Sequence, residues 1–491
     1  MNSFDHFNEK QAEYVIVGAG ISGLLLALKL SKDPIKLGKG IIVLEKEAQL
    51  GGRFFFTQLN QFTGKNNTQV LDEIHENSIK NLFLSGPGFE FLDANSLEVL
   101  YRHFEAQLTE AEKNKLDEFY SELNKISSNE QQERKIVFVK KEYVELNELL
   151  LSSSDFFTKK EAEYLKNLLN DSLQNSENKN NENILFEKSK YWLDLPKSTK
   201  DTLTPFFQTI FGPNWEKARL SVLQKGLSDF FINFRKKIPS YFYRNACFEY
   251  FIANVLRSRG VVIRNLCELV RVQTNADKKF KLMLSDELQP EHKQLECNRL
   301  IFAMPLNDCL GIIAKEHFSP NQSRFLSKVR PLSLVISEIT NFNELKNEQW
   351  PAYLQTGDCL VFPVERTIAY ITSDNRILMT IKLDYEESLQ APAVREAISR
   401  LRKALTRIIK QELTEELKKG ARIPQKRIAE RIILLPVAIT IPCDIAANVE
   451  VKETKMGIEG MYCCGDNFPG MADESWKMVV NSVNDVCQNL S

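Results

Sequence analysis

The sequence predicts an α/β protein in which a parallel sheet in one region is accompanied by an antiparallel sheet in another. Three observations support this fold class. Residues 14–45 spell a strand, a glycine turn, a helix and a second strand; short apolar runs between residues 334 and 381 alternate with turn residues; and an apolar strand near residue 461 ends at a glycine and an acid. A chain of 491 residues is also too long for one hydrophobic core, so at least two domains are expected.

The first of these units begins with a strand and a glycine motif. Residues 14–17 (Tyr-Val-Ile-Val) form an apolar run rich in β-branched side chains, as expected for a buried parallel strand. Gly18, Gly20 and Gly23 follow in the spacing G-x-G-x-x-G. Glycines in this motif permit a tight turn, an approach of bare backbone to a pyrophosphate, and close packing of helix on strand. Residues 24–30 are apolar on nearly every side, so their helix is expected to be buried.

An acidic residue ends the next strand of this unit. Residues 41–44 (Ile-Ile-Val-Leu) are wholly apolar, and Glu45 follows 22 positions after Gly23. A carboxylate about 20 residues beyond the glycine motif suits the ribose hydroxyls of a dinucleotide. The helix N-terminus, with Ser22 in the same motif, offers N–H groups and partial positive charge to phosphates. The unit therefore predicts a Rossmann-like dinucleotide-binding domain.

Two further segments distinguish FAD from NAD as the dinucleotide. Soon after the acid, the chain reads Gly51, Gly52 and Arg53. Paired glycines let backbone pass close to the pyrophosphate, and an arginine can pair with a phosphate through its guanidinium fork. Near the C-terminus, the apolar strand stops at Gly465 and Asp466, and a helix is expected at about residues 475–488.

With these motifs in this order, the sequence resembles the flavin-dependent amine oxidase superfamily, which includes monoamine and polyamine oxidases, protoporphyrinogen oxidase and phytoene-desaturase-like enzymes. The resemblance implies that FAD is the cofactor and that Asp466 holds its ribityl chain. It also implies that Leu269 offers its backbone to the adenine, and that residues 300–305 (Leu-Ile-Phe-Ala-Met-Pro) lead out of the FAD-binding domain. Flavin in this superfamily usually accepts hydride from a substrate C–H at N5, which implies an FAD-dependent oxidoreductase.

The same resemblance implies two interleaved domains. The FAD-binding domain is expected to comprise residues 1–95, 240–312 and 441–491, and the substrate domain residues 96–239 and 313–440. The first substrate segment is charged and helix-rich, with helices expected at residues 108–126 and 159–173. The second has strand-like runs at the short spacing of an antiparallel sheet, at residues 334–336, 359–362, 368–371 and 377–381. Residues 394–419 are then expected to form one long amphipathic helix or a broken pair of helices.

The catalytic residues are not identified by the sequence. Trp476 and Lys477, at the start of the last helix, are the candidates, because by resemblance they lie near the pyrimidine edge of the flavin; Lys477 is equally well explained as a solvated lysine at a helix start. Many amine oxidases have a lysine in a substrate-domain strand, where this chain has Ser333. Phe54–Phe56 and His75 are better explained as core and surface residues, respectively.

Three functions therefore remain open. The first is an FAD-dependent oxidase or dehydrogenase acting on an amine or a similar small-molecule C–H donor, with dioxygen or another electron acceptor. The second is a desaturase-like or isomerase-like flavoprotein acting on a larger apolar substrate. The third is a non-catalytic escort protein that retains the fold; the Gly-Gly-Arg and Gly-Asp segments weigh against it, because an escort has no need of a flavin-binding site.

Composition excludes several other classes. With 64 basic and 65 acidic residues, the net charge of −1 gives no indication of a nucleic-acid partner. No signal peptide, membrane anchor or spanning segment is evident, so a cytoplasmic location is expected. Nine scattered cysteines and five histidines show no metal-ligand spacing, so no metal is expected. Cys463 and Cys464 are interpreted as packing residues rather than as sites of covalent flavin attachment.

Overall fold

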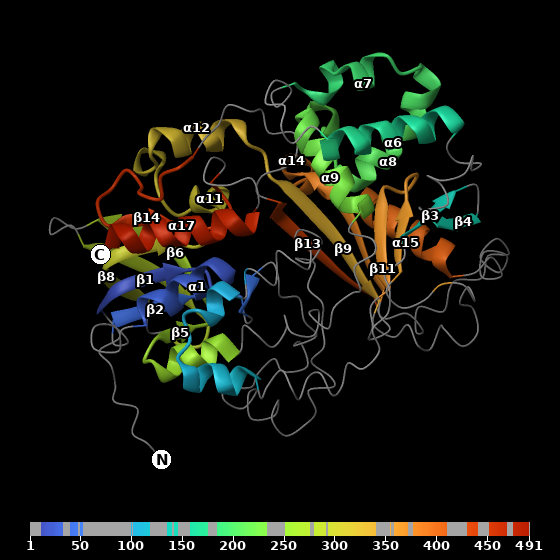
Figure 1. Cartoon of the computed structure of the whole chain (residues 1–491). Helices are drawn as coiled ribbons and strands as arrows, with labels where there is room; N and C mark the ends of the chain where they lie inside the picture. The colour runs from blue at the N-terminus through green and yellow to red at the C-terminus, as the bar shows by residue number, and fades with distance from the viewer. Residues whose placement is uncertain are drawn as a thin grey trace. The chain divides into compact units, whose positions relative to one another are not determined.

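The computed structural model places a parallel sheet and an antiparallel sheet in separate units of the chain (Figure 1). Unit 1 comprises residues 1–129, 240–329 and 449–491, and unit 2 comprises residues 130–239 and 330–448. The α/β fold class predicted from the sequence is confirmed. The structure describes residues 11–32, 40–47, 50–52, 100, 102–117, 135–139, 142–145, 158–174, 184–232, 251–274, 279–290, 293–339, 354, 358–371, 377–409, 430–439, 451–468 and 475–490.

Unit 1 contains a seven-stranded sheet in the order β5-β2-β1-β8-β7-β6, with β14 also paired to β8. Strands β5, β2, β1, β8 and β14 are parallel to one another, whereas β6 and β7 continue the sheet in antiparallel fashion. Every residue of β2 is buried, as expected for a parallel strand covered on both faces. The strands are β1 Gln11–Val17, β2 Ile41–Leu44, β5 Val262–Arg264, β6 Cys267–Thr274, β7 Phe280–Asp286, β8 Gln294–Phe302 and β14 Met461–Cys463.

Two helices from opposite ends of the chain share the core of unit 1. Helix α1 (Ile21–Leu30) is buried from Leu24 to Leu28, as its apolar sequence predicted, and contacts α17 (Ser475–Leu490) through Val480 and Val483 of the same core. Leu100 and the apolar side chains of residues 102–117 join this core. Unit 1 also contains α11 Leu306–Cys309, η10 Lys315–His317 and α12 Pro320–Lys328, and residues 102–105, 110–117 and 251–258 are helical as well.

Residues 102–117, which the sequence analysis placed in the substrate domain, are joined to unit 1 by a partly buried ion pair. The Arg259 guanidinium lies 2.6 Å from the Glu112 carboxylate, and the two side chains are 11% and 17% exposed. Arg259 also donates hydrogen bonds to the backbone carbonyls of Leu28 and Gln107. Burial by itself would raise the pKa of Glu112, but the hydrogen bonds from Arg259 and Thr109 lower it overall.

Replacing Arg259 with methionine is expected to destabilise the protein by about 3 kcal/mol, because it leaves the partly buried Glu112 carboxylate without its cation and removes the hydrogen bonds to the Leu28 and Gln107 carbonyls. Chemical denaturation with matched buffers measures this difference. Lys113→Met is the control, because the Lys113–Glu110 pair is 39% and 85% exposed and its loss should change stability by less than about 0.5 kcal/mol. Equal stabilities of the two variants would contradict the structural role of Arg259.

Unit 2 is organised around a second seven-stranded sheet, in the order β13-β9-β12-β11-β10-β3-β4. All neighbouring strands are antiparallel except β10 and β3, which are parallel. The four strand-like runs of the sequence fall within β9, β10, β11 and β12. The strands are β3 Lys135–Val139, β4 Glu142–Glu145, β9 Leu332–Ile339, β10 Cys359–Phe362, β11 Thr367–Ile371, β12 Ile377–Asp384 and β13 Glu430–Ile439.

Two hydrophobic clusters hold the helices of unit 2. One contains the rings of Phe186, Phe207 and Trp215, with Phe207 in edge-to-face contact with the other two; the other joins the sheet to the apolar face of α15 through Leu401 and Leu405. Helix α15 covers the first part of the expected 394–419 helix; residues 410–419 lie outside the described part of the chain. The helical elements are α6 Lys159–Gln174, η7 Phe186–Lys188, α7 Lys190–Leu193, α8 Lys197–Phe211, η8 Trp215–Lys217, α9 Leu220–Ile232, α14 Tyr385–Ser388 and α15 Ala391–Ile408.

Candidate functional site

The candidate site lies at the carboxyl ends of the parallel strands of unit 1, where β1 turns into α1. Gly18 has a φ of +102° and donates its N–H to the Leu44 carbonyl at 2.8 Å. A Cβ at Gly18 would lie 2.8 Å from the Ala303 carbonyl oxygen. The first glycine is therefore required both by its backbone angle and by the neighbouring strand end.

Gly23, in the first turns of α1, is fixed by packing. A Cβ at this position would lie 2.0 Å from the Gly18 carbonyl oxygen and 3.3 Å from the Ala303 Cβ. No side chain fits between the helix and the glycine turn. Gly18 and Gly23 together let the N-terminus of α1 close onto the strand.

Gly20 differs from both, because it faces open space. It is the N-cap of α1 and has an extended backbone, with φ −70° and ψ 179°. Among the described residues, the Gly52 Cα is the one atom within 4 Å of a Cβ placed at Gly20, at a distance of 3.9 Å. The α1 N-terminus has no side-chain cap and no acid in its first turn. Its first N–H groups and this bare backbone form a cradle suited to a phosphate.

The Gly51-Gly52 pair forms the opposite wall of the cradle. Gly51 donates its N–H to the Ala19 carbonyl at 2.8 Å and pairs with Gly20 as a parallel β-bridge. Gly52 has a φ of +59°, and a Cβ there would lie 3.2 Å from the Gly20 Cα. Two segments identified separately in the sequence thus meet as backbone against backbone. Arg53, the third member of the motif, lies outside the described residues.

Glu45 closes the turn from β2. Its carboxylate accepts hydrogen bonds from the N–H groups of Ala19 at 2.8 Å and Glu47 at 3.0 Å, and the residue is 7% exposed. Burial raises the pKa of Glu45, and the two backbone N–H groups offset only part of this rise. The carboxylate is thereby fixed beside the glycine turn, where it can accept further hydroxyl donors.

Because the pKa of Glu45 is higher in the folded protein than the ordinary value of 4.5, the folded state binds more protons between the two values. The stabilising contribution of this group is therefore present at low pH and is lost as the pH rises above about 4.5. We compare the melting temperatures of the cofactor-free wild type and of Glu45→Gln. The difference, wild type minus variant, is expected to decrease as the pH is raised from 4.5 to 7. Differential scanning calorimetry measures it, and a difference that rises with pH would contradict the assignment.

The C-terminal motif reaches the same turn from the other end of the chain. Strand β14 ends at Cys463, and Cys464 donates its N–H to the Phe302 carbonyl at 2.8 Å. Gly465 follows with a φ of +136°, and a Cβ there would lie 3.6 Å from the Ser22 Oγ. The next residue, Asp466, is 8% exposed. The Gly465-Asp466 turn therefore stands against the first turn of α1.

The structure brings together most of the residues predicted from the sequence. Leu269 lies on β6, is 3% exposed and pairs with Leu284. The start of this strand lies beside Glu45, because the Cys267 N–H donates a hydrogen bond to the Glu45 carbonyl. Phe54–Phe56 and His75 lie outside the described residues. The predicted residues that gather around the turn are Gly18, Gly20, Ser22, Gly23, Glu45, Gly51, Gly52, Gly465 and Asp466.

The two candidate catalytic residues open α17. Trp476 is partly buried against the core of unit 1, and the exposed Lys477 places its Nζ 5.2 Å from the centroid of the Trp476 ring. This cation–π contact holds the lysine against the indole. Their role in a reaction stays a prediction.

Ser333 is used within unit 2. It is fully buried on β9, and its hydroxyl donates a hydrogen bond to the Ser388 Oγ on α14 at 2.8 Å; Ser388 in turn donates to the Tyr385 carbonyl. A hydroxyl held in this way differs from a lysine ammonium in charge, reach and burial.

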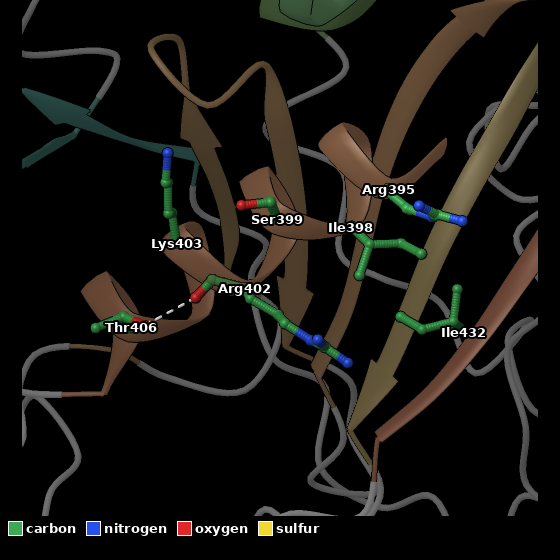
Figure 2. Close-up of a pocket in the computed structure, with 7 residues that line it drawn as sticks. All are labelled: Arg395, Ile398, Ser399, Arg402, Lys403, Thr406 and Ile432. Carbon is green, nitrogen blue, oxygen red and sulfur yellow. Dashed lines mark hydrogen bonds between the residues drawn. The ribbon is translucent and has the colours of Figure 1, made fainter. Parts of the chain in front are cut away.

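Unit 2 has a shallow groove of ≈ 510 Å³ along α15. Figure 2 shows Arg395, Ile398 and Arg402 extending from the helix toward Ile432 of β13, whereas Lys403 points away from them. Arg402 is paired with Glu430 at 2.9 Å. The lining residues include no carboxylate, imidazole or thiol, so the groove offers no general acid–base pair and is not the candidate site: Arg395, Ile398, Ser399, Arg402, Lys403, Thr406 and Ile432.

The paired cysteines before Gly465 are buried thiols. Cys463 and Cys464 are both 0% exposed, and burial raises the pKa of each thiol. A buried neutral thiol is a weak nucleophile, which fits a packing role. Within the part of the chain that the structure describes, no three His, Cys, Asp or Glu side chains are grouped to hold a metal. None of the described helices is long and apolar enough to span a bilayer.

Asn467 and Ser482 also belong to this site, although the sequence analysis missed them. Asn467 directly follows Asp466 and is 1% exposed. Ser482 lies on α17 and accepts the Gly465 N–H at 2.9 Å. The asparagine next to the Gly-Asp pair was a possible signal, but the serine, 17 residues after Gly465, had none.

Comparison with known proteins is consistent with this arrangement. The family described as "NAD(P)-binding Rossmann-like domain" matches residues 16–83, whereas no curated protein matches the sequence significantly. An oxidoreductase from Methanosarcina mazei is similar with a TM-score of 0.54 and 15% identity, covering 97% of this chain and 100% of that one. Putrescine oxidase bound to putrescine has a TM-score of 0.52 and 12% identity, covering 98% of this chain and 98% of that one. Cyclohexylamine oxidase from Brevibacterium oxydans has a TM-score of 0.51 and 12% identity, covering 98% of this chain and 99% of that one.

At these identities the similarity establishes the fold. The chain has a Rossmann-like dinucleotide-binding domain and shares the fold of these amine oxidases. The resemblance to the flavin-dependent amine oxidase superfamily, which the motifs indicated, is confirmed at the level of fold.

Proposed function

We propose that the protein is an FAD-dependent oxidoreductase that takes hydride from a C–H bond of a small molecule, with unit 1 as the FAD-binding domain and unit 2 as the substrate domain. The observation that carries the proposal is the convergence of Gly465-Asp466 on the first turn of α1. A dinucleotide held only by its ADP portion needs the glycine turn and Glu45, but no carboxylate from the far end of the chain. An acid at that position is suited to the ribityl chain of a flavin.

The residues present fit FAD. The backbone of Gly20, Gly51 and Gly52 leaves room for a pyrophosphate, and the uncapped N-terminus of α1 supplies N–H groups and partial positive charge. Glu45 would accept the ribose hydroxyls, and Asp466 would accept those of the ribityl chain. Arg53 is proposed as a further phosphate ligand. Bound flavin would supply the hydride acceptor, which dioxygen or another electron acceptor would then reoxidise.

An amine or a similar C–H donor is our first proposal for the substrate, because the similar structures include two amine oxidases. Ser333 supports a second candidate. This residue stands where many amine oxidases have a lysine, and its buried hydroxyl donates a hydrogen bond to Ser388. A desaturase-like or isomerase-like reaction on a larger apolar substrate is therefore the alternative.

The visible absorption spectrum of the purified protein tests the proposal. Flavin absorption, with release of FAD on denaturation, is the expected result. Anaerobic titration with a panel of aliphatic diamines and cyclic amines, followed by polyenes and porphyrinogens, then separates the two substrate classes by the loss of that absorption. A protein that binds no FAD, even when supplied with an excess, would refute the function and favour a non-catalytic escort.

A further inference from the structure

The side chain of Asn467 connects the C-terminal motif to the strand end beside it. Its Oδ1 accepts the Leu306 N–H at 3.2 Å, and its Nδ2 lies 3.4 Å from the Met304 carbonyl oxygen as donor. At 1% exposure, both halves of the amide thus have backbone partners in the segment that follows β8. An amide buried without such partners would cost about 1–3 kcal/mol, so this pairing is a specific structural feature.

The segment that Asn467 contacts is also the one against which the glycine turn packs. Ala303 donates its N–H to the Val17 carbonyl at 2.8 Å. Its carbonyl oxygen would lie 2.8 Å from a Cβ at Gly18, and its Cβ would lie 3.3 Å from a Cβ at Gly23. The four residues 303–306 thus contact the glycine turn at one end and the Asn467 amide at the other.

The other side of the motif is held by α17. Gly465 donates its N–H to the Ser482 Oγ at 2.9 Å, and the Ser482 hydroxyl lies 3.0 Å from the Gly465 carbonyl. Asp466 is therefore the residue between two anchored neighbours, Gly465 and Asn467. Its backbone position is determined by contacts that involve no cofactor atom.

We propose that Asn467 is a positioning residue that sets where the Asp466 carboxylate stands relative to the phosphate cradle, and so controls affinity for the riboflavin half of FAD. The inference rests on the proposed function. The ADP half of the cofactor would contact the glycine turn and Glu45, whereas the described hydrogen bonds of the Asn467 side chain go to Met304 and Leu306. The ribityl hydroxyls would contact Asp466, whose location depends on the Asn467 amide. Loss of the amide therefore weakens FAD binding and spares ADP binding.

Isothermal titration of the cofactor-free full-length protein with ADP and with FAD tests this separation. For Asn467→Ala we expect the FAD dissociation constant to rise about tenfold, the effect of losing one or two hydrogen bonds of ordinary strength. The dissociation constant for ADP is expected to stay within about twofold of the wild type. Asn467→Ser has one hydroxyl in place of the amide, so its FAD dissociation constant is expected to rise less than that of Asn467→Ala, again without a matching rise for ADP. This variant also serves if the alanine variant does not fold.

Gln322→Ala is the matched control for lost stability. Gln322 is another fully buried amide in unit 1; it accepts the Ser319 N–H and donates to the carbonyls of Glu453 and Lys455. This variant is expected to lower the melting temperature without separating ADP from FAD.

The outcomes distinguish this inference from the function on which it rests. A wild type that binds ADP but not FAD refutes the proposed function, and this inference with it. A wild type that binds both, together with Asn467 variants that weaken both ligands equally or neither, overturns the positioning role and leaves the function standing. Weakening confined to FAD in the Asn467 variants and absent from Gln322→Ala supports it.

Discussion

Replacing Gly20 with valine is expected to give a folded protein that binds FAD much more weakly and is purified with less of it. The backbone of Gly20 is extended, so an L-residue is tolerated there, and among the described residues its nearest obstacle to a Cβ is the Gly52 Cα at 3.9 Å. The valine side chain would instead fill the cradle in which the pyrophosphate is proposed to lie. Overpacking of this kind costs about 1–3 kcal/mol, so the affinity for FAD is expected to fall up to about 100-fold.

The absorbance ratio of flavin to protein and the melting temperature together measure this effect. Gly311→Val is the matched control, because the nearest described atom to a Cβ at Gly311 is the Asp308 carbonyl oxygen at 4.0 Å, away from the glycine motif. The control is expected to keep its flavin. Full FAD content in Gly20→Val, at unchanged stability, would show that the phosphate cradle is elsewhere.

Gly23→Ala is expected to have a different effect, namely loss of the fold of unit 1. The added Cβ would lie 2.0 Å from the Gly18 carbonyl oxygen, a backbone atom that cannot move without separating α1 from β1. We expect destabilisation by about 3 kcal/mol or more, which is large for the addition of a single methyl group. Any loss of FAD would follow from this structural damage.

Chemical denaturation of the cofactor-free proteins distinguishes the two glycine variants. Gly23→Ala is expected to unfold at much lower denaturant concentration than the wild type, whereas Gly20→Val and Gly311→Ala are expected to unfold near the wild-type midpoint. A Gly23→Ala protein of normal stability would mean that the packing between α1 and the glycine turn is looser than the structure shows. The pair thus separates the glycine that faces the ligand from the one that faces the protein.

Much of unit 1 could be predicted from local sequence. The run 14–17, the glycine spacing and Glu45 predict β1, α1 and the acid after β2, because strand and helix periodicity and backbone freedom are local properties. The four strand-like runs of unit 2 lie within β9 to β12 for the same reason. The pairing of Ser333 with Ser388, by contrast, joins residues 55 positions apart and had no local signature.

The helical segment 102–117 shows where local information ends. The sequence predicted a helix at residues 108–126, and the resemblance assigned it to the substrate domain. The structure places Phe104, Leu108 and Leu116 in the core of unit 1, and Arg259, 147 positions from Glu112, joins the segment to that unit. Membership of a unit is decided by such distant contacts.

The amino-acid sequence by itself determined the glycine turn, the acid after the second strand and the presence of a Gly-Asp motif, because each depends on residues adjacent in the chain. Tertiary structure alone decided that Gly465 lies beside Ser22, so that a Cβ at Gly465 would be 3.6 Å from the Ser22 Oγ. It also decided that the side chains of Asn467 and Ser482 hold the Gly465-Asp466 turn. These are contacts across as many as 443 positions of chain, and they form only when α1, α17 and the end of β8 pack around one core.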